Sequence, residues 1–223
     1  MILRKEIKYR ISLSEAYSLQ QKLEKIMDAD PHNGAEGYKI RSLYFDSLND
    51  AALKEVLDGV EEKRKLRLRI YNAEIEKVKL EYKCKSDTDG IKKVIKLNAE
   101  QAAKMMGGDY GFLEEMDSDL ARKIYLRLLS GFYLPRSIVE YRRHAYFYEV
   151  GDTRVTLDTE IKGTTMVDSF LEEEIFTFPL LPLDVVVLEL KYNDFLPCFI
   201  KNLTKEIDRL PRANSKYVLS RLI

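Results

Sequence analysis

The strongest constraint on the fold is a set of stretches in which charged and apolar residues alternate with a period of two. In "KLRLRIY", residues 65–71, basic residues occupy positions 65, 67 and 69, with Leu or Ile at the positions between them. Because a strand turns successive side chains to opposite faces, this stretch predicts one apolar face and one cationic face. Six other stretches alternate in the same way and are predicted strands: residues 3–11, 38–46, 79–85, 139–150, 153–161 and 185–192.

Segments with helical periodicity separate many of these strands. Ser12 and Glu15 form a capping-box pair at the start of residues 12–27, where apolar residues recur at helical spacing. Further helices are predicted over residues 48–59, 97–108 and 117–131, and a last one from Phe195 towards Arg209. This order indicates an α+β fold with a mainly antiparallel sheet, since buried parallel strands would be continuously apolar. No repeat or linker interrupts the chain, so residues 1–223 are predicted to form a single domain.

Composition excludes several classes of protein. The 223 residues include 37 Lys or Arg and 37 Asp or Glu, and a net charge of zero argues against a general nucleic-acid binder. No apolar run reaches the roughly 20 residues of a membrane span, so a cytoplasmic location is expected. Cys84 and Cys198 are too few for a disulfide framework and are expected to be reduced core residues. The glycine motifs of P-loop and dinucleotide-binding proteins are absent.

The charged strand faces have two interpretations. A single face of this kind is usually in contact with water, as in most antiparallel sheets. Seven faces that favour Arg and Lys instead suggest about eight strands closed into a β-barrel, with helices over the apolar faces and a tunnel lined by the charged ones. Buried like charges repel one another, so such a tunnel requires a polyanion such as a chain of phosphates. Glu6, Glu81 and Glu189 would then pair with neighbouring cations or hold a divalent metal.

The strand motifs also resemble a known family along the whole chain. The stretches "RKEIKY", "YKIRSLYFD", "KLRLRIY", "LEYKCK", "YRRHAY", "RVTLDT", "LELKY" and "SKY" occur in the order typical of the VTC domain. This family is the polyphosphate polymerase branch of the CYTH/triphosphate tunnel metalloenzymes. The resemblance implies an antiparallel β-barrel tunnel with helices packed around it. It also implies transfer of the γ-phosphate of ATP to a polyphosphate chain, with Mn²⁺ or Mg²⁺ as cofactor.

The resemblance further implies which residues form the site. Those expected to bind phosphate are Lys8, Arg67, Arg69, Lys83, Lys93, Arg143, Arg154, Lys191, Ser215 and Lys216, with Lys92 as the alternative to Lys93. Within this set, Arg67, Arg69 and Lys216 are expected to act on the transferring phosphate. Glu189, in "LELKY", is expected to bind the metal.

One departure from the wider superfamily bears on the reaction. Triphosphatase and cyclase members open with "ExExK", whereas the corresponding positions here are Arg4, Glu6 and Lys8. The arginine replaces a metal ligand, which favours the polymerase branch. Two alternatives stay open: hydrolysis of inorganic or nucleoside triphosphates, and a non-catalytic module that binds polyphosphate or another anion. The expected partners are ATP or triphosphate and polyphosphate, without nucleic acid, and a membrane-protein partner is left open.

Overall fold

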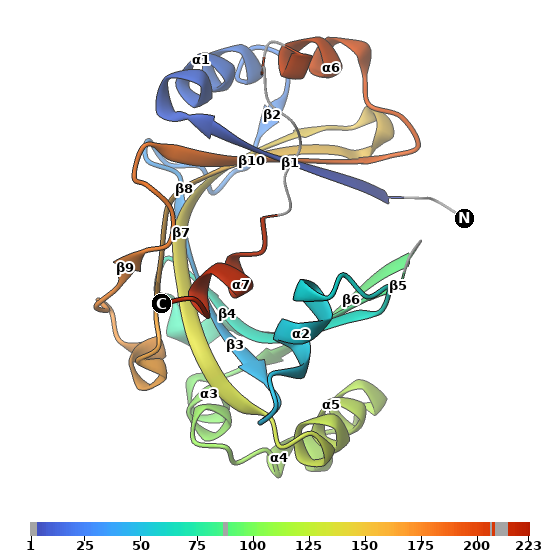
Figure 1. Ribbon diagram of the computed structural model, residues 1–223, viewed down its shortest axis with the longest axis vertical. Coiled ribbons are helices and arrows are strands. Elements are labelled where there is room, and N and C mark those ends of the chain that lie inside the picture. Colours follow the sequence, from blue (N-terminus) through green and yellow to red (C-terminus); the bar gives the residue numbers. More distant parts are fainter. Residues whose placement is uncertain (1–3, 87–88, 206, 208–213) are drawn as a thin grey trace. The chain divides into compact units, whose positions relative to one another are not determined.

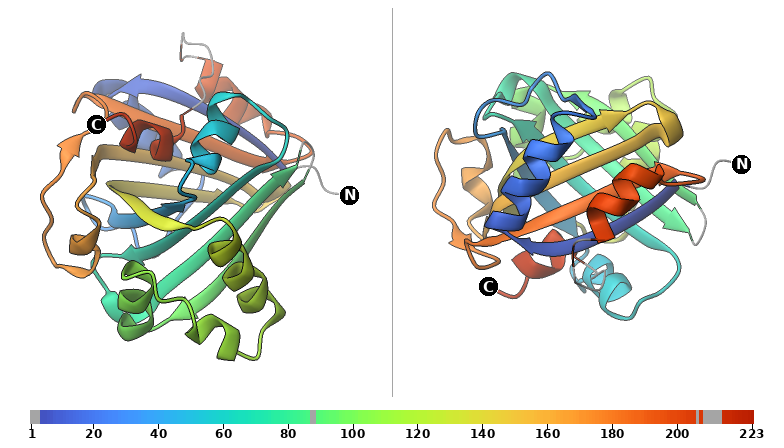
Figure 2. Two further views of the ribbon diagram at one scale, coloured as in Figure 1. Left: turned by 60° about the horizontal axis from the view of Figure 1, so that its bottom comes forward. Right: turned by 90° about the horizontal axis from the view of Figure 1, so that it is seen from above.

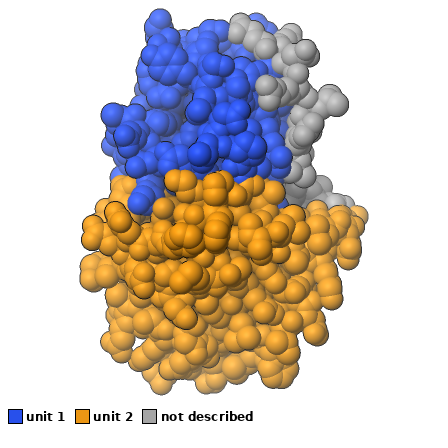
Figure 3. All heavy atoms as spheres, turned by 60° about the vertical axis from the view of Figure 1, so that its left-hand side comes forward, with its two compact units in different colours: residues 1–39, 141–161, 181–215 blue, residues 40–140, 162–180, 216–223 orange. Residues whose placement is uncertain are grey.

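The computed structural model describes residues 4–86, 89–205, 207 and 214–223. The chain divides into two compact units, each assembled from three separate segments (Figure 3). Unit 1 contains residues 1–39, 141–161 and 181–215, and unit 2 contains residues 40–140, 162–180 and 216–223. That residues 1–223 form a single domain stays a prediction.

The strands belong to a sheet of ten, and each pair with a described register is antiparallel (Figure 1). They are β1 (Arg4–Ser12), β2 (Asp28–Ala29), β3 (Tyr38–Asp46), β4 (Lys63–Tyr71), β5 (Val78–Ser86), β6 (Asp89–Leu97), β7 (Leu134–Tyr148), β8 (Thr153–Thr164), β9 (Phe178–Pro179) and β10 (Val185–Asn193). The hydrogen-bonded order is β1-β10-β8-β7-β3-β4-β5-β6, with β2 beside β7 and β9 beside β8. The predicted α+β class with an antiparallel sheet is confirmed. Within the described residues this strand order has two ends, β1 and β6.

Helices connect many of the strands. They are α1 (Leu13–Leu23), α2 (Ala51–Leu57), α3 (Ala99–Met106), α4 (Phe112–Glu115), α5 (Asp119–Ser130), α6 (Cys198–Lys205) and α7 (Lys216–Ser220), with short 3₁₀ turns η1 (Ile75–Lys77), η2 (Val150–Asp152) and η3 (Val167–Leu171). All five predicted helices are present, although the predicted end of the last one, at Arg209, lies outside the described residues. The sequence did not predict α4 and α7. Every helix in the described ranges is too short or too polar to cross a membrane.

Side-chain caps explain where two helices begin. The Ser12 hydroxyl accepts the amide of Glu15, and the Glu15 carboxylate accepts the amide of Ser12, which completes the predicted capping box at α1. Asn98 and Gln101 form the same reciprocal pair at α3. Each cap satisfies amide groups that have no partner inside the helix. The caps therefore fix the strand-to-helix corners at residues 12 and 98.

In unit 1, α1 and α6 cover the apolar face of β1 and β10 (Figure 1, Figure 2). Ile11 of β1 and Leu188 and Leu190 of β10 are buried in one cluster with Leu19 and Leu23 of α1. The two leucines of α1 are four residues apart, so they share one face of the helix. The charged residues that alternate with these strand positions therefore project from the opposite face.

In unit 2, α3, α4 and α5 cover the apolar face of β3 to β6 (Figure 1). Leu43, Leu68 and Leu80, from three neighbouring strands, are buried with Met105 of α3 and Ile124 of α5. The alternating leucines of the sequence thus point to the helices, as predicted. The cationic positions between them project from the other face of the sheet.

The two cysteines differ in burial. Cys84 is half-buried and packs against the core of unit 2. Cys198 is exposed at the first position of α6, so the prediction of a core residue is wrong there. The reason is the orientation of the helix, which turns Ile200 to the core instead.

Candidate functional site

Unit 2 presents a dense cationic face on β4, β5 and β6. Three rows of register partners share this face: Lys65–Lys83–Lys92, Arg67–Glu81–Val94 and Arg69–Lys79–Lys96. Of these nine positions seven are cationic and one is acidic, which leaves an excess of six positive charges (seven minus one). We call these nine residues the cationic grid. Such a face attracts anions with several charges.

Glu81 lies at the centre of the cationic grid. Its Oε2 accepts a hydrogen bond from Arg67 Nε at 2.8 Å and lies 3.7 Å from Arg69 Nη1. Its Oε1 lies 2.6 Å from Lys92 Nζ. Burial raises the pKa of the Glu81 carboxyl, but Arg67, Arg69 and Lys92 outweigh burial and lower the pKa to about 2. The carboxylate therefore stays ionised and holds three cationic side chains in place.

Tyr44 is a buried phenol beside the grid. Arg67 Nη1 donates a hydrogen bond to the Tyr44 hydroxyl at 3.0 Å, and the guanidinium carbon lies 5.7 Å from the ring centroid. Burial raises the pKa of Tyr44, but Arg67, Arg69 and Lys65 outweigh burial and lower the pKa to about 8. Tyr44 therefore belongs to the site electrostatically. The sequence does not indicate this, because only the strand register relates Tyr44 to Arg67.

The two candidate lysines of β6 project from opposite faces. Lys92 pairs in register with Lys83 and contacts Glu81, whereas Lys93 pairs with Tyr82, a member of the hydrophobic core. The structure therefore places Lys92 in the cationic grid and Lys93 on the helix-covered side. Adjacent strand residues face opposite sides, so only Lys92 shares a face with Arg67 and Arg69. Which of the two lysines binds phosphate stays a prediction.

Helix α7 lies on the same face of unit 2 as the grid and begins with Lys216. The hydroxyl of the next residue, Tyr217, donates to Asp46 Oδ2 at 2.5 Å. The Tyr217 ring packs on the Tyr44 ring, with centroids 5.1 Å apart. Ser215, the other predicted phosphate ligand of this motif, is half-buried directly before the helix. Nothing in the sequence relates Asp46 to Tyr217, although the tyrosine belongs to the "SKY" motif.

Unit 1 contains a second charged cluster, on the face of β1 and β10 opposite its helices. Lys8 pairs in register with Glu189, and Glu6 pairs with Lys191. Lys8 Nζ lies 2.6 Å from Glu6 Oε1 and 3.8 Å from Glu189 Oε2. Lys191 Nζ contacts Glu189 Oε1 and lies 3.9 Å from Glu6 Oε2. We call these four residues the lysine–glutamate ring.

The ring keeps its charges paired. Burial lowers the pKa of Lys8, but Glu189 and Glu6 outweigh burial and raise the pKa above its ordinary value. Lys8 is therefore fully protonated at neutral pH. The predicted ligands Lys8, Lys191 and Glu189 thus lie together, and Glu6 is brought to them by the register of β1 and β10.

Strands β7 and β8 extend the charged face of unit 1. Arg143 donates from Nε and Nη2 to the two carboxylate oxygens of Asp158, at 2.6 and 2.8 Å. The Arg154 guanidinium lies 4.7 Å from the Phe147 ring centroid, and its Nη2 is 3.9 Å from Asp30 Oδ2. Both predicted phosphate ligands are thus oriented by protein carboxylates. Their action on phosphate stays a prediction.

The residues around Glu189 fit a divalent metal that is bound partly by the protein and partly by phosphate oxygens. Glu6 and Glu189 lie close enough to contact the same two lysines. Thr156, beside Glu189 in the register, has a buried hydroxyl oxygen with no hydrogen-bond partner within the described residues. The part of the chain that the structure describes contains no group of three or more His, Cys, Asp or Glu side chains able to enclose a metal. Mg²⁺ and Mn²⁺ bind to one or two carboxylates together with phosphate oxygens, so this donor set suits a phosphate-bound metal.

Arg41, which the sequence places on a charged strand face, has a structural role. It projects from β3 on the side opposite Tyr44 and is 1% exposed. Its Nε donates to Glu140 Oε2 at 2.8 Å, and Nη1 and Nη2 donate to the carbonyl oxygens of Phe170 and Glu173, each at 3.0 Å. Arg41 therefore fixes η3 and the residues directly after it, for which the sequence suggests no chemical role.

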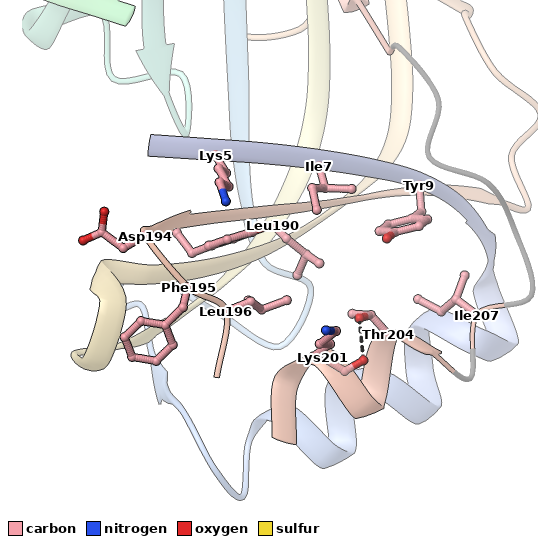
Figure 4. A pocket seen from close by; sticks show the side chains of 11 residues that line it. Lys5, Ile7, Tyr9, Leu190, Asp194, Phe195, Leu196, Lys201, Thr204 and Ile207 are labelled. Carbon is pink, nitrogen blue, oxygen red and sulfur yellow. Dashed lines mark hydrogen bonds between the residues drawn. The ribbon is translucent and has the colours of Figure 1, made fainter. Parts of the chain in front are cut away.

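A cavity of about 520 Å³ lies on the reverse side of the lysine–glutamate ring, between β1, β10 and α6 (Figure 4). Ile7 and Leu190 line it, whereas Lys8 and Glu189, their sequence neighbours, project from the other face of the strands. One layer of backbone therefore separates the cavity from the ring. The cavity is not part of the candidate phosphate site.

Comparison with known families gives one match along nearly the whole chain. A sequence model described as "VTC domain" matches residues 3–223. Comparison with curated proteins gave no match.

Several solved structures are similar to the chain. A candidate adenylyl cyclase, HpAC1 from Hippeastrum, described as having a dominant triphosphatase activity, is 17% identical, with 100% of this chain and 96% of that chain covered and a TM-score of 0.60. A candidate adenylate cyclase from Bacillus halodurans is 14% identical, with 95% of each chain covered and a TM-score of 0.51. A chain of the Schizosaccharomyces pombe Mediator head module is 10% identical, with 95% and 98% covered and a TM-score of 0.53. At these identities the likeness concerns the fold alone, and the predicted tunnel-type fold is confirmed.

Proposed function

Because the chain belongs to the VTC domain family, we propose that it is an ATP-dependent polyphosphate polymerase. It would transfer the γ-phosphate of ATP to a polyphosphate chain, with Mn²⁺ or Mg²⁺ as cofactor. Membership of the family supports an enzyme of the triphosphate tunnel class. The triphosphatase activity described for HpAC1 is consistent with a triphosphate as the substrate here.

The observation that carries the proposal is the cationic grid. Seven cations gathered on one sheet face around one carboxylate repel one another, because like charges at short distance raise the electrostatic energy. A triphosphate or polyphosphate supplies several negative charges at a regular spacing. Arg67 and Arg69 present planar guanidinium groups, which form two parallel hydrogen bonds to phosphate oxygens more readily than lysine does. The grid is therefore better suited to a chain of phosphates than to a single anion.

Phosphoryl transfer requires little covalent chemistry from a protein. It requires aligned donor and acceptor groups, and positive charge where the transferring phosphate and the leaving group carry negative charge. In the proposal Arg67 and Arg69 bind and orient the triphosphate, and Lys216 interacts with the transferring phosphate. Glu189, with Glu6 beside it, would hold the metal, which neutralises phosphate charge when bound. The acceptor is orthophosphate or the end of a polyphosphate chain.

The number and pairing of the carboxylates in unit 1 favour a polymerase over a triphosphatase. The first position of the "ExExK" pattern is Arg4 in this chain, which removes one carboxylate from β1. The remaining carboxylates of the lysine–glutamate ring each contact a lysine. Water competes with phosphate as an acceptor in any such site, so hydrolysis is the second candidate function. The similarity to HpAC1 is the observation that favours it.

The products of ATP turnover distinguish these functions. The chain is incubated with ATP and Mn²⁺, and separately with Mg²⁺, and ADP, orthophosphate and polyphosphate are resolved together. A polymerase yields ADP with matching polymer-bound phosphate, whereas a triphosphatase yields orthophosphate without polymer. A non-catalytic module yields neither, but binds tripolyphosphate with an affinity that falls as salt rises.

A variant pair tests the role of the grid in this assay. Arg67→Ala is expected to lower turnover by about a hundredfold, the usual loss when a preorganised charge donor is removed. Arg64→Ala is the matched control, because Arg64 projects from the opposite face of β4 and contacts Glu62. Equal turnover in the two variants would refute the assignment of Arg67.

A further inference from the structure

Helix α7 is too short to hold its own position. It contains five residues, Lys216–Ser220, whereas isolated helices of fewer than about 12 residues are marginal in water. Contacts with the rest of unit 2 must therefore place it. Tyr217 and Ser220 provide such contacts, since they are 2% and 0% exposed and lie three residues apart on one helix face.

Each of the two buried side chains bonds to a different strand of unit 2. The Ser220 hydroxyl lies 2.7 Å from the Ser137 hydroxyl of β7. The Tyr217 hydroxyl donates to Asp46 at the end of β3, and the Tyr217 ring packs on Tyr44. Tyr44 in turn accepts the hydrogen bond from Arg67 described above. A continuous chain of contacts therefore joins the helix that begins with Lys216 to the cationic grid.

Asp46 is a rigid acceptor for this bond. Its carboxylate is fully buried and accepts three backbone amides at the junction of β3 and α2, those of Ser47, Ala52 and Leu53, at 2.8, 2.8 and 3.0 Å. Burial and the nearby Asp46 carboxylate raise the pKa of Tyr217, so the phenol keeps the proton that it donates. Arg221 Nη1 donates to the same hydroxyl at 2.9 Å. The Tyr217 ring therefore has little freedom to move.

We infer that the hydrogen bond from Tyr217 to Asp46 positions Lys216 for its contact with phosphate. Lys216 is the first residue of α7 and directly precedes Tyr217. Because the Tyr217 side chain is anchored on Asp46, it fixes the position of the adjacent Lys216 backbone. Tyr217 and Asp46 are positioning residues in this account and do not touch the phosphate. The inference rests on the proposed function, in which Lys216 interacts with the transferring phosphate.

A double-mutant cycle of Tyr217→Phe and Lys216→Ala tests the inference. Tyr217→Phe keeps the ring packed on Tyr44 and removes only the hydroxyl. It is expected to lower kcat for ATP turnover by about tenfold or more while KM changes little, because a displaced catalytic group costs rate more than binding. In the Lys216→Ala background the same substitution is expected to have no further effect, since no lysine remains to be positioned.

Tyr110→Phe is the matched control. Tyr110 is also a buried phenol of unit 2, and its hydroxyl donates to the carbonyl oxygen of Tyr133 at 2.7 Å. Removal of the Tyr110 hydroxyl should leave kcat unchanged. An equal loss of kcat in Tyr110→Phe, or additive effects of Tyr217→Phe and Lys216→Ala, would overturn the inference.

A second readout separates this inference from the proposed function. The affinity for inorganic tripolyphosphate is measured by calorimetry in the wild type, the two single variants and the double variant. If the wild type binds tripolyphosphate without turning over ATP, the proposed function fails. In that case Lys216 would contribute to tripolyphosphate affinity alone. Non-additive effects of Tyr217→Phe and Lys216→Ala on that affinity would still support the positioning role of Tyr217, and additive effects would overturn the inference.

Discussion

Replacement of Glu81 by Gln tests the electrostatic account of the cationic grid. The side chain is 2% exposed and contacts Arg67, Arg69 and Lys92. Glutamine preserves its shape and removes its charge. The three cations then lose their common anionic partner, so the folded state is expected to become less stable at neutral pH.

The pKa of Glu81 sets the magnitude of the effect. Its folded-state value of about 2 lies below the ordinary value of 4.5. At about 1.4 kcal/mol for each tenfold change in proton affinity, this difference corresponds to about 3 kcal/mol of stability. Because the pKa is lowered by folding, this contribution is complete above pH 4.5 and is lost as the pH falls through 2. At pH 3 about 2 kcal/mol of it, more than half, has gone.

Urea unfolding of the wild type and Glu81→Gln at pH 7 and pH 3 measures this contribution. We expect the free energy of unfolding to differ by about 3 kcal/mol at pH 7, and the difference to shrink by about 2 kcal/mol at pH 3. Glu62→Gln is the matched control, because Glu62 contacts Arg64 in an exposed pair, worth less than about 1 kcal/mol. An equal difference between wild type and Glu81→Gln at both pH values would refute the reasoning.

Three further predictions follow from the sites described above. Tyr44 ionises near pH 8 and then places a negative charge beside the grid arginines, so tripolyphosphate affinity should fall between pH 7 and pH 9 in the wild type relative to Tyr44→Phe, as calorimetry would show. Lys92→Ala should weaken tripolyphosphate binding by about tenfold, whereas Lys93→Ala, on the opposite face, should leave it unchanged. Gly37→Ala should lower the free energy of unfolding, measured in urea, by more than about 2 kcal/mol, because φ is +73° and the new Cβ would lie 2.4 Å from the backbone oxygen of Arg143. Gly59→Ala should lower it by about 1 kcal/mol, because φ is +69° there but the space around the new Cβ is open.

Period-two alternation predicts which side chains share a face because that relation is local. Arg67 and Arg69 are two residues apart, so any strand through them places both on one side. The leucines between them must then meet the helices, as they do in unit 2. The sequence therefore predicts the apolar and charged faces of most strands correctly.

Relations between strands depend on register, which alternation in one strand does not specify. Lys92 and Lys93 are adjacent, and only their pairing with Lys83 and Tyr82 decides which one joins the grid. The partnership of Tyr217 with Asp46 is harder to foresee, because 171 residues separate them. Neither local propensity nor spacing carries information about such contacts.

Helix α7 shows the same limit for secondary structure. Five residues are too few for a helical pattern, and the turn forms because buried bonds to β3 and β7 hold it. Arg41 is a further case. It alternates with apolar residues as the grid cations do, but it donates to the carbonyl oxygens of Phe170 in η3 and of Glu173 just after it. Charge alone therefore does not separate a ligand-binding arginine from a structural one.

In the proposed function, the central carboxylate would make phosphate binding at the grid an exchange of anions. Glu81 already occupies Arg67 and Lys92, so an incoming phosphate must compete with an anion tethered to the same sheet. One phosphate group gains little from this exchange, whereas a chain that contacts several cations at once gains from each additional contact. If the proposed function holds, Glu81 would thereby favour long phosphate chains over orthophosphate. It would also keep the arginines aligned after a chain has left, so that the next chain meets an ordered surface.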